Sequence, residues 1–283
     1  MTQPEAPMAP SQKSETTHRL EGRGLDVAYG DKPILHDVDF RVEDGRVTVL
    51  LGPNGSGKST LLKTLARTLS PRAGQVVLDG HLIHRQSTRM VARKLGMLPQ
   101  SSAAPEGLTV RELVGLGRFP YQTLWRQWTR KDEDAVGAAM TTAGVTALAD
   151  RPVDELSGGQ RQRCWIAMVL AQETDLILLD EPTTFLDLKV QVELLELLVN
   201  LAHNHGRTLL IVLHDLNLAA TYADTLVMLK AGRIEHSGLP GEVFTAAKLK
   251  QVFDLDSHII EDPHSGRPIC VPRVAIPGRR AVT

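Results

Sequence analysis

The glycine-rich stretch Gly52–Thr60, GPNGSGKST, has the residue types and the spacing of a phosphate-binding loop. It fits the pattern G-x-x-x-x-G-K-[ST] through Gly52, Gly57, Lys58 and Ser59. Glycines let backbone N–H groups curl around a triphosphate, and a following helix would point its positive end at the phosphates. Lys58 would reach the β- and γ-phosphates, and the Ser59 hydroxyl would coordinate Mg²⁺. The stretch therefore predicts binding of a nucleoside triphosphate with magnesium.

The residues on either side of this loop suit the same chemistry. Residues 47–51 form a short β-branched and leucine-rich run that is typical of a buried strand. After the loop, leucines recur at helical spacing from Leu61 to Leu69. Strand, glycine loop and helix together predict a nucleotide site, with the Thr60 hydroxyl donating to an α- or β-phosphate oxygen. The predicted nucleotide contacts are Gly52, Pro53, Asn54, Gly55, Ser56, Gly57, Lys58, Ser59 and Thr60.

A second anion site is predicted at residues 156–163, LSGGQRQR. Ser157 is a good N-cap, and Gly158 and Gly159 free the backbone at the start of a predicted helix. The amino end of a helix attracts anions through its unpaired N–H groups and its dipole. This stretch therefore predicts an anion-binding helix terminus that, unlike the phosphate loop, has no lysine.

Carboxylates and a histidine follow two apolar runs. Residues 175–180, DLILLD, predict a strand buried on both faces that ends in Asp180, with Glu181 next. Residues 208–213 predict a neighbouring strand that ends at His214. Taken alone, Asp180 and Glu181 are equally consistent with a solvated pair of acids, and His214 is equally consistent with a histidine that caps a helix. Beside a phosphate loop they predict that Asp180 holds Mg²⁺, that Glu181 orients or deprotonates water, and that His214 touches the γ-phosphate.

Several further elements are needed to position these groups. Strands are predicted over 20–29, 33–42, 75–78 and 95–98, with Asp44-Gly45 as a hairpin turn into the phosphate-loop strand. A capping box at Thr109 to Glu112 and a second helix start at Thr129 to Asp132 lie within a helical insertion over about residues 101–155. Towards the end, residues 226–236 predict a hairpin, 242–253 a helix, and 259–271 an extended tail segment.

The composition excludes some classes of protein. A net charge of −1 provides no basic field for nucleic acid. No apolar run approaches the roughly 18 residues of a membrane span, and the polar start lacks a signal-peptide core. The two cysteines, Cys164 and Cys270, lack metal-ligand spacing, and a disulfide is not expected in a reducing compartment. We therefore expect a cytosolic chain, with residues 1–18 as a disordered tail rich in Pro, Ser, Thr and Gln.

The motifs together resemble the nucleotide-binding subunit of ATP-binding cassette (ABC) transporters. LSGGQRQR, LILLDEP and IVLHDLN, with the phosphate loop before them, carry the resemblance over about residues 20–262. It implies an α/β fold: a P-loop NTPase (RecA-like) core with a mainly parallel sheet, an N-terminal antiparallel β portion and a helical subdomain. The implied cassette spans residues 19–255, with 256–283 as a C-terminal extension.

The resemblance also assigns roles to matching positions. Tyr29 would stack on adenine, although the residue by itself equally suits an edge-strand aromatic. Gln100 would sense Mg²⁺ and the membrane partner, and Asp187 would lie in the loop that contacts a second copy. Ser157, Gly158 and Gly159 would bind the γ-phosphate of ATP held by that copy. The family thus implies ATP and Mg²⁺ as cofactors and a head-to-tail dimer that sandwiches two ATP molecules.

A finer resemblance points to the ATPase subunits of bacterial ferric-siderophore importers. It lies in GRFPYQTLWRQW, DEPTTFLDLKVQVELLELL and VFDLDSHIIEDPHSGRPICVP. It implies membrane permease subunits as partners, an indirect substrate-binding protein, no nucleic acid, and a peripheral location on the cytoplasmic face of the cell membrane. Cobalamin or haem import and export of another cargo stay open as alternatives. A translation factor or resistance protein would usually carry two cassettes in one chain, and this chain has one.

Overall fold

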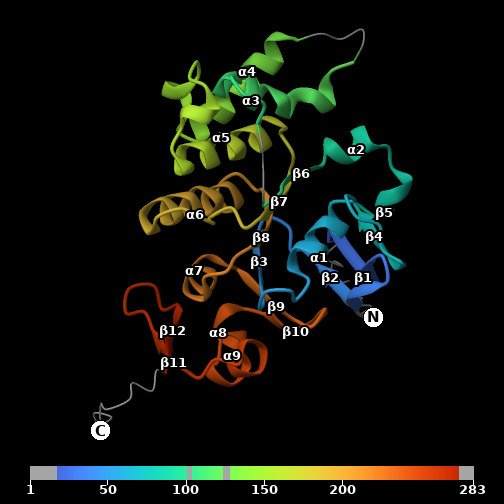
Figure 1. The fold of residues 1–283 in the computed structure, drawn as a ribbon, viewed down its shortest axis with the longest axis vertical. Coiled ribbons are helices and arrows are strands. Elements are labelled where there is room, and N and C mark those ends of the chain that lie inside the picture. The colour runs from blue at the N-terminus through green and yellow to red at the C-terminus, as the bar shows by residue number, and fades with distance from the viewer. Residues whose placement is uncertain (1–17, 101–103, 124–127, 274–283) are drawn as a thin grey trace, which may run out of the picture.

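The computed structural model describes residues 18–100, 104–123 and 128–273 (Figure 1). Among these residues, one antiparallel sheet has the strand order β2-β1-β4-β5. Its strands are β1 (Leu20–Tyr29), β2 (Lys32–Arg41), β4 (Ala73–Leu78) and β5 (His81–Leu82). The predicted tail, apart from His18, and the chain after Arg273 lie outside the described residues.

A six-stranded central sheet has the order β10-β9-β3-β8-β7-β6. The strands β9, β3, β8, β7 and β6 run parallel, and β10 pairs antiparallel with β9. Because β3, β7 and β8 are buried along their whole length, their sequences read as continuous apolar runs. The bounds are β3 (Val47–Leu51), β6 (Leu95–Leu98), β7 (Leu176–Asp180), β8 (Thr208–Val212), β9 (Thr225–Lys230) and β10 (Arg233–Gly238).

The predicted hairpin turn at Asp44-Gly45 is wrong, because β2 and β3 belong to different sheets. Gly45 does turn the chain, with φ 65°, and its N–H donates to the Thr208 hydroxyl at 2.9 Å. However, β3 pairs in parallel with both β8 and β9, so no edge remains for β2. The turn therefore carries the chain from one sheet into the centre of the other.

Helices cover the sheets and form a separate layer at one end. The helices α3 and α4 pack on α5, and α6 lies beneath that group (Figure 1). The predicted capping box of Thr109 with Glu112 is confirmed at the start of α3. The predicted helix start at Thr129 is also confirmed: Thr129 is the N-cap of α4, and its N–H donates to Asp132 at 3.0 Å. Helix bounds are α1 (Lys58–Leu65), α2 (Thr88–Ala92), α3 (Val110–Gly115), α4 (Arg130–Thr142), α5 (Gly158–Ala171), α6 (Leu188–His203) and α7 (Leu216–Tyr222). Short 3₁₀ turns are η1 (Ile83–Arg85), η2 (Leu116–Tyr121), η3 (Thr146–Leu148) and η4 (Val153–Glu155).

The C-terminal region differs from the sequence prediction in two ways. The single helix predicted over 242–253 is two helices, α8 (Pro240–Val243) and α9 (Ala246–Phe253), because Phe244 leaves the helical conformation and Thr245 caps α9. The predicted extended segment is a hairpin of β11 (Ser257–Glu261) and β12 (Pro268–Pro272). The Asn217 amide accepts from the Cys270 N–H at 2.7 Å and donates to its carbonyl at 3.3 Å, which holds β12 against α7.

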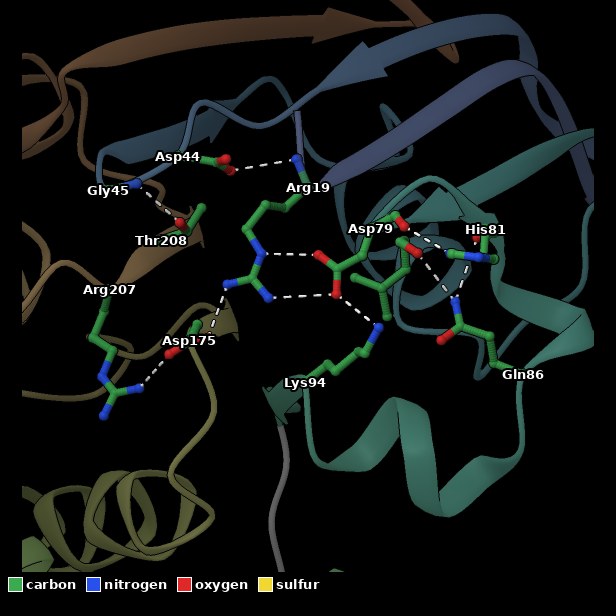
Figure 2. Close-up of polar contacts among 11 residues, drawn as sticks. Arg19, Asp44, Gly45, Asp79, His81, Gln86, Lys94, Asp175, Arg207 and Thr208 are labelled. Carbon is green, nitrogen blue, oxygen red and sulfur yellow. Dashed lines mark hydrogen bonds and ion pairs between the residues drawn. The ribbon is translucent and has the colours of Figure 1, made fainter. Parts of the chain in front are cut away.

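A charge network joins the antiparallel sheet to the amino ends of the central strands (Figure 2). Arg19 donates to Asp79 at 2.9 Å and lies 3.1 Å from Asp175. Lys94, just before β6, lies 2.8 Å from Asp79, and Arg207, just before β8, lies 3.0 Å from Asp175. The network lies at the amino ends of the parallel strands. It therefore joins the two sheets without reaching the carboxyl ends of those strands.

Replacing Arg19 by Met is expected to lower the free energy of unfolding by about 1–2 kcal/mol, because the partly buried Asp79 and the exposed Asp175 each lose a charged donor. Urea denaturation would measure the change. Arg23→Met is the control, since Arg23 is half exposed and pairs only with Glu21 among the described ion pairs. Equal losses in the two variants would contradict a structural role for the network.

Candidate nucleotide-binding site

The phosphate loop connects β3 to α1 at the carboxyl edge of the central sheet, where open α/β sheets bind ligands. Two of its glycines are sterically required. A Cβ on Gly52 would lie 2.2 Å from the carbonyl oxygen of Leu229, and Gly57 has φ 104° with Leu35 only 2.6 Å from the Cβ position. The loop therefore packs its backbone against the sheets while leaving its amides available to an anion.

The Lys58 ammonium lies inside the loop and is almost fully buried. It donates to the carbonyl oxygens of Gly52 at 2.8 Å and Pro53 at 3.1 Å. Burial lowers the pKa of Lys58, and the nearby carboxylates of Glu181 and Asp180 oppose that shift. The side chain is thus positioned at the centre of the loop, beside the two acids.

Asp180 ends β7 directly beside the start of α1. Its Oδ1 accepts a hydrogen bond from the Ser59 hydroxyl at 2.9 Å, so the two predicted magnesium ligands lie together. Its Oδ2 is buried and has no hydrogen-bond partner among the described residues. Burial raises the pKa of Asp180; the Ser59 hydrogen bond opposes this shift, and the Glu181 charge adds to it. A buried carboxylate oxygen without a donor is an open ligand position for a cation.

The Glu181 side chain contacts residues that follow the two neighbouring strands. Its Oε2 accepts from Gln100 Nε2 at 2.6 Å, and its Oε1 lies 2.5 Å from His214 Nε2. Gln100 follows β6, Glu181 follows β7 and His214 follows β8, and these three strands are adjacent in the sheet. The structure therefore brings these three predicted site residues into direct contact.

A cleft of about 400 Å³ opens over Glu181 and His214, and Gln100 and Asp180 are not among its lining residues. Six predicted loop residues line it together with Glu181 and His214: Asn54, Gly55, Gly57, Lys58, Ser59 and Thr60. Gly52, Pro53 and Ser56 lie in the loop but not on the wall, and Tyr29 is about half exposed at the end of β1, also outside the wall. The assignment of Tyr29 to adenine stacking stays a prediction.

The opposite wall comes from residues that the sequence did not single out. Lys32, Pro33, Ile34 and His36 contribute it from β2, and Ala231 and Gly232 from the β9–β10 turn. The Gly232 N–H donates to the Ser56 carbonyl at 3.0 Å, and its carbonyl accepts from the His36 N–H at 3.0 Å. No local motif marks these residues, because only the meeting of the two sheets places them at the cleft.

The predicted second anion site forms a separate cleft of about 360 Å³ that shares no lining residue with the first. Ser157, Gly158 and Gly159 line it together with Asp187. Ser157 Oγ accepts from the Gln160 N–H at 3.3 Å, and Asp187 Oδ1 accepts from the Val190 N–H at 3.0 Å, so each caps a helix. The structure thus places all four residues together, away from the phosphate loop of the same chain.

Two kinds of feature are absent from the described residues. Within residues 18–100, 104–123 and 128–273, no group of three or more His, Cys, Asp and Glu side chains is arranged to hold a metal ion by protein ligands alone. Over the same ranges, no helix combines the length and apolarity needed to cross a bilayer.

Comparison with known proteins gives a consistent result. The ABC transporter family profile matches residues 35–184. The chain is 51% identical over 253 residues to the achromobactin transport ATP-binding protein CbrD of Dickeya dadantii, covering 89% of this chain and 94% of that protein. It is 48% identical over 259 residues to the ferric enterobactin transport ATP-binding protein FepC of Escherichia coli, covering 92% and 96%. The dimeric structure of MJ0796, a bacterial ABC transporter cassette, matches with a TM-score of 0.70 and 28% identity, over 78% of this chain and 98% of that one. The chain therefore belongs to the ABC transporter family and is one of its ATP-binding, ATP-hydrolysing cassettes.

Proposed function

We propose that this chain hydrolyses ATP to energise the import of ferric siderophores through a membrane permease. The observation that carries the enzymatic part is the contact of Glu181 with Gln100 and His214 at the mouth of the phosphate loop. The cargo class is supported by the two curated relatives, whose names specify achromobactin and ferric enterobactin transport. Import of cobalamin or haem, or export, is the alternative.

The residues beside the phosphate loop fit a magnesium ion. Ser59 Oγ and the buried Oδ2 of Asp180, which has no hydrogen-bond partner among the described residues, are oxygen ligands of the kind that Mg²⁺ prefers. The Gln100 amide, which contacts Glu181 through its nitrogen, carries a further oxygen of that kind. Bound there, the ion would neutralise charge on the β- and γ-phosphates. A nearby cation would also favour the ionised form of Asp180 and so oppose the effect of burial.

The chain's own residues would supply the rest of the catalysis. Lys58 and the loop amides would stabilise negative charge on the γ-phosphoryl group as it transfers. Glu181 would orient the attacking water and accept its proton, and His214 would hold Glu181 and the γ-phosphate in line. These groups lie at the ends of rigid buried strands, which limits the reorganisation needed when ATP binds.

The second anion cleft supports a head-to-tail dimer. It lies apart from the phosphate loop, so a second copy is needed for Ser157, Gly158 and Gly159 to reach the γ-phosphate, with Asp187 at the contact. The cassette would span residues 19–255, with 101–155 as its helical subdomain and 256–283 as an extension. The surface around residues 100–121 would dock the permease on the cytoplasmic face of the membrane, and the exposed Leu116 and Phe119 suit such a contact. A substrate-binding protein would act on the other side.

Iron uptake by iron-starved cells carrying Glu181→Gln tests the proposal. Ferric siderophores, haem and cobalamin would be offered in turn, and the expected result is loss of uptake for one ferric siderophore. Glu196→Gln is the matched control, because this carboxylate is exposed on α6. Unchanged uptake of every siderophore by cells that express the Glu181→Gln chain would overturn the assignment of a siderophore cargo. Loss of haem or cobalamin uptake would instead identify that compound as the cargo.

A further inference from the structure

Thr184 makes a contact with Glu181 that the assigned roles do not explain. Its hydroxyl donates to Glu181 Oε2 at 3.2 Å, and its N–H donates to the Glu181 carbonyl at 3.3 Å. The same Oε2 accepts from Gln100, while Oε1 faces His214. The carboxylate is therefore held by three side chains, and only Thr184 lies in the same turn of the chain.

The backbone of this turn brings the hydroxyl back onto the carboxylate. Glu181 has φ 53° and Phe185 has φ 64°, so two residues other than glycine adopt left-handed conformations within five positions. Such conformations cost on the order of 1 kcal/mol each and persist where surrounding contacts enforce them. The Phe185 side chain is fully exposed and contributes no burial. Both hydrogen bonds from Thr184 to Glu181 close this turn and connect its two ends.

We propose that Thr184 is a positioning residue for the Glu181 carboxylate. This inference rests on the proposed function, in which Glu181 acts on the attacking water. Gln100 and His214 come from other strands and have their own expected partners, the magnesium ion and the γ-phosphate. When they engage those partners, their bonds to Glu181 are weakened or exchanged. Thr184 is three residues away along one turn and moves with Glu181, so its hydrogen bond maintains the carboxylate orientation through turnover.

Thr184→Val tests this role because valine has nearly the same shape and lacks the donor. The expected result is a fall in kcat for ATP hydrolysis of about tenfold, typical of losing one hydrogen bond to a charged group. KM and the dissociation constant for ATP should stay unchanged, since Thr184 is not among the residues that line the nucleotide cleft. Thr184→Ser retains the hydroxyl and should restore kcat to within about twofold of the parent.

Two further variants separate positioning from a general structural effect. Thr142→Val removes a comparable hydroxyl bond, 2.9 Å to the Ala138 carbonyl on the exposed side of α4, and should leave kcat unchanged. In a Glu181→Gln chain, adding Thr184→Val should lower the residual rate no further, because Thr184 acts through the carboxylate.

The outcomes distinguish this inference from the proposed function. Full activity of Glu181→Gln would overturn the role of Glu181 and, with it, this inference. Loss of activity in Glu181→Gln with an unchanged kcat in Thr184→Val would overturn only the role of Thr184. A Ser variant as slow as the Val variant, or a tenfold further loss in the Glu181→Gln background, would also overturn it. Urea midpoints equal to the parent's would confirm that the compared chains are folded.

Discussion

Replacing Glu181 by Gln is expected to lower the rate of ATP hydrolysis by about a thousandfold, within the range that a general base contributes. The amide retains the size and hydrogen-bonding reach of the carboxylate but cannot accept the proton of the attacking water. ATP should still bind, because the phosphate loop with Lys58 and Ser59 is untouched. The variant should therefore lose turnover while still holding nucleotide.

Phosphate release in the presence of Mg²⁺ would measure the rate, and equilibrium binding of ATP would measure occupancy. Glu196→Gln makes the same chemical change at an exposed position on α6 and should retain the parental rate. A loss of less than about tenfold in Glu181→Gln would contradict a general base at this position. Weakened ATP binding together with lost turnover would instead indicate a role in binding nucleotide.

Replacing Arg118 by Met is expected to lower the free energy of unfolding by about 3–5 kcal/mol, because it leaves a buried carboxylate without its charged partner. Arg118 is fully buried and donates to Asp132 at 2.9 Å. It also donates to the Ala171 carbonyl and to Glu173, each at 2.7 Å, and its guanidinium lies 4.1 Å from the Tyr121 ring centre. One side chain thus joins η2, α4 and the end of α5.

Urea unfolding followed by tryptophan fluorescence would measure this loss. Arg151→Met is the control, since its pair with Glu155 spans 4.0 Å on the surface and should contribute less than about 0.5 kcal/mol. Adding Asp132→Asn to Arg118→Met removes the unpaired charge and should recover part of the stability. A loss no larger than that of Arg151→Met would show that Arg118 is not a structural anchor.

The ion pair of Arg118 with Asp132 also predicts how the free energy of unfolding changes at acid pH. Burial by itself raises the pKa of Asp132, but hydrogen bonds from Thr129 and Arg118 outweigh it and hold the pKa below its usual value. A carboxyl with a lowered folded-state pKa contributes its stability fully above the unfolded value of about 4. This contribution should be lost as the pH falls through the lower folded-state pKa. It should be absent from the Asp132→Asn chain.

Several features that depend on residues close in sequence were determined by the sequence. β1, β3 and β6 have the bounds that their apolar patterns predict, and the helices expected after Thr109 and Thr129 begin at those residues. The phosphate loop and its strand follow from one run of residues, but α1 ends at Leu65, before the Leu69 to which the leucine spacing extends, because Arg67 adopts a left-handed conformation with φ 62°. Spacing within one turn or one strand decides such features, and a single chain displays that spacing directly.

The tertiary structure decided which distant residues meet. The phosphate-loop strand lies between β8 and β9 and not beside β2, and β2 then supplies a wall of the nucleotide cleft. Gln100 and Glu181, 81 positions apart, share a hydrogen bond, and the C-terminal segment folds back as a hairpin on α7. Strand pairing and packing depend on burial summed over the whole chain, and local propensity does not determine them. The motifs therefore indicate the chemistry of the site, and the folded sheets bring its residues together.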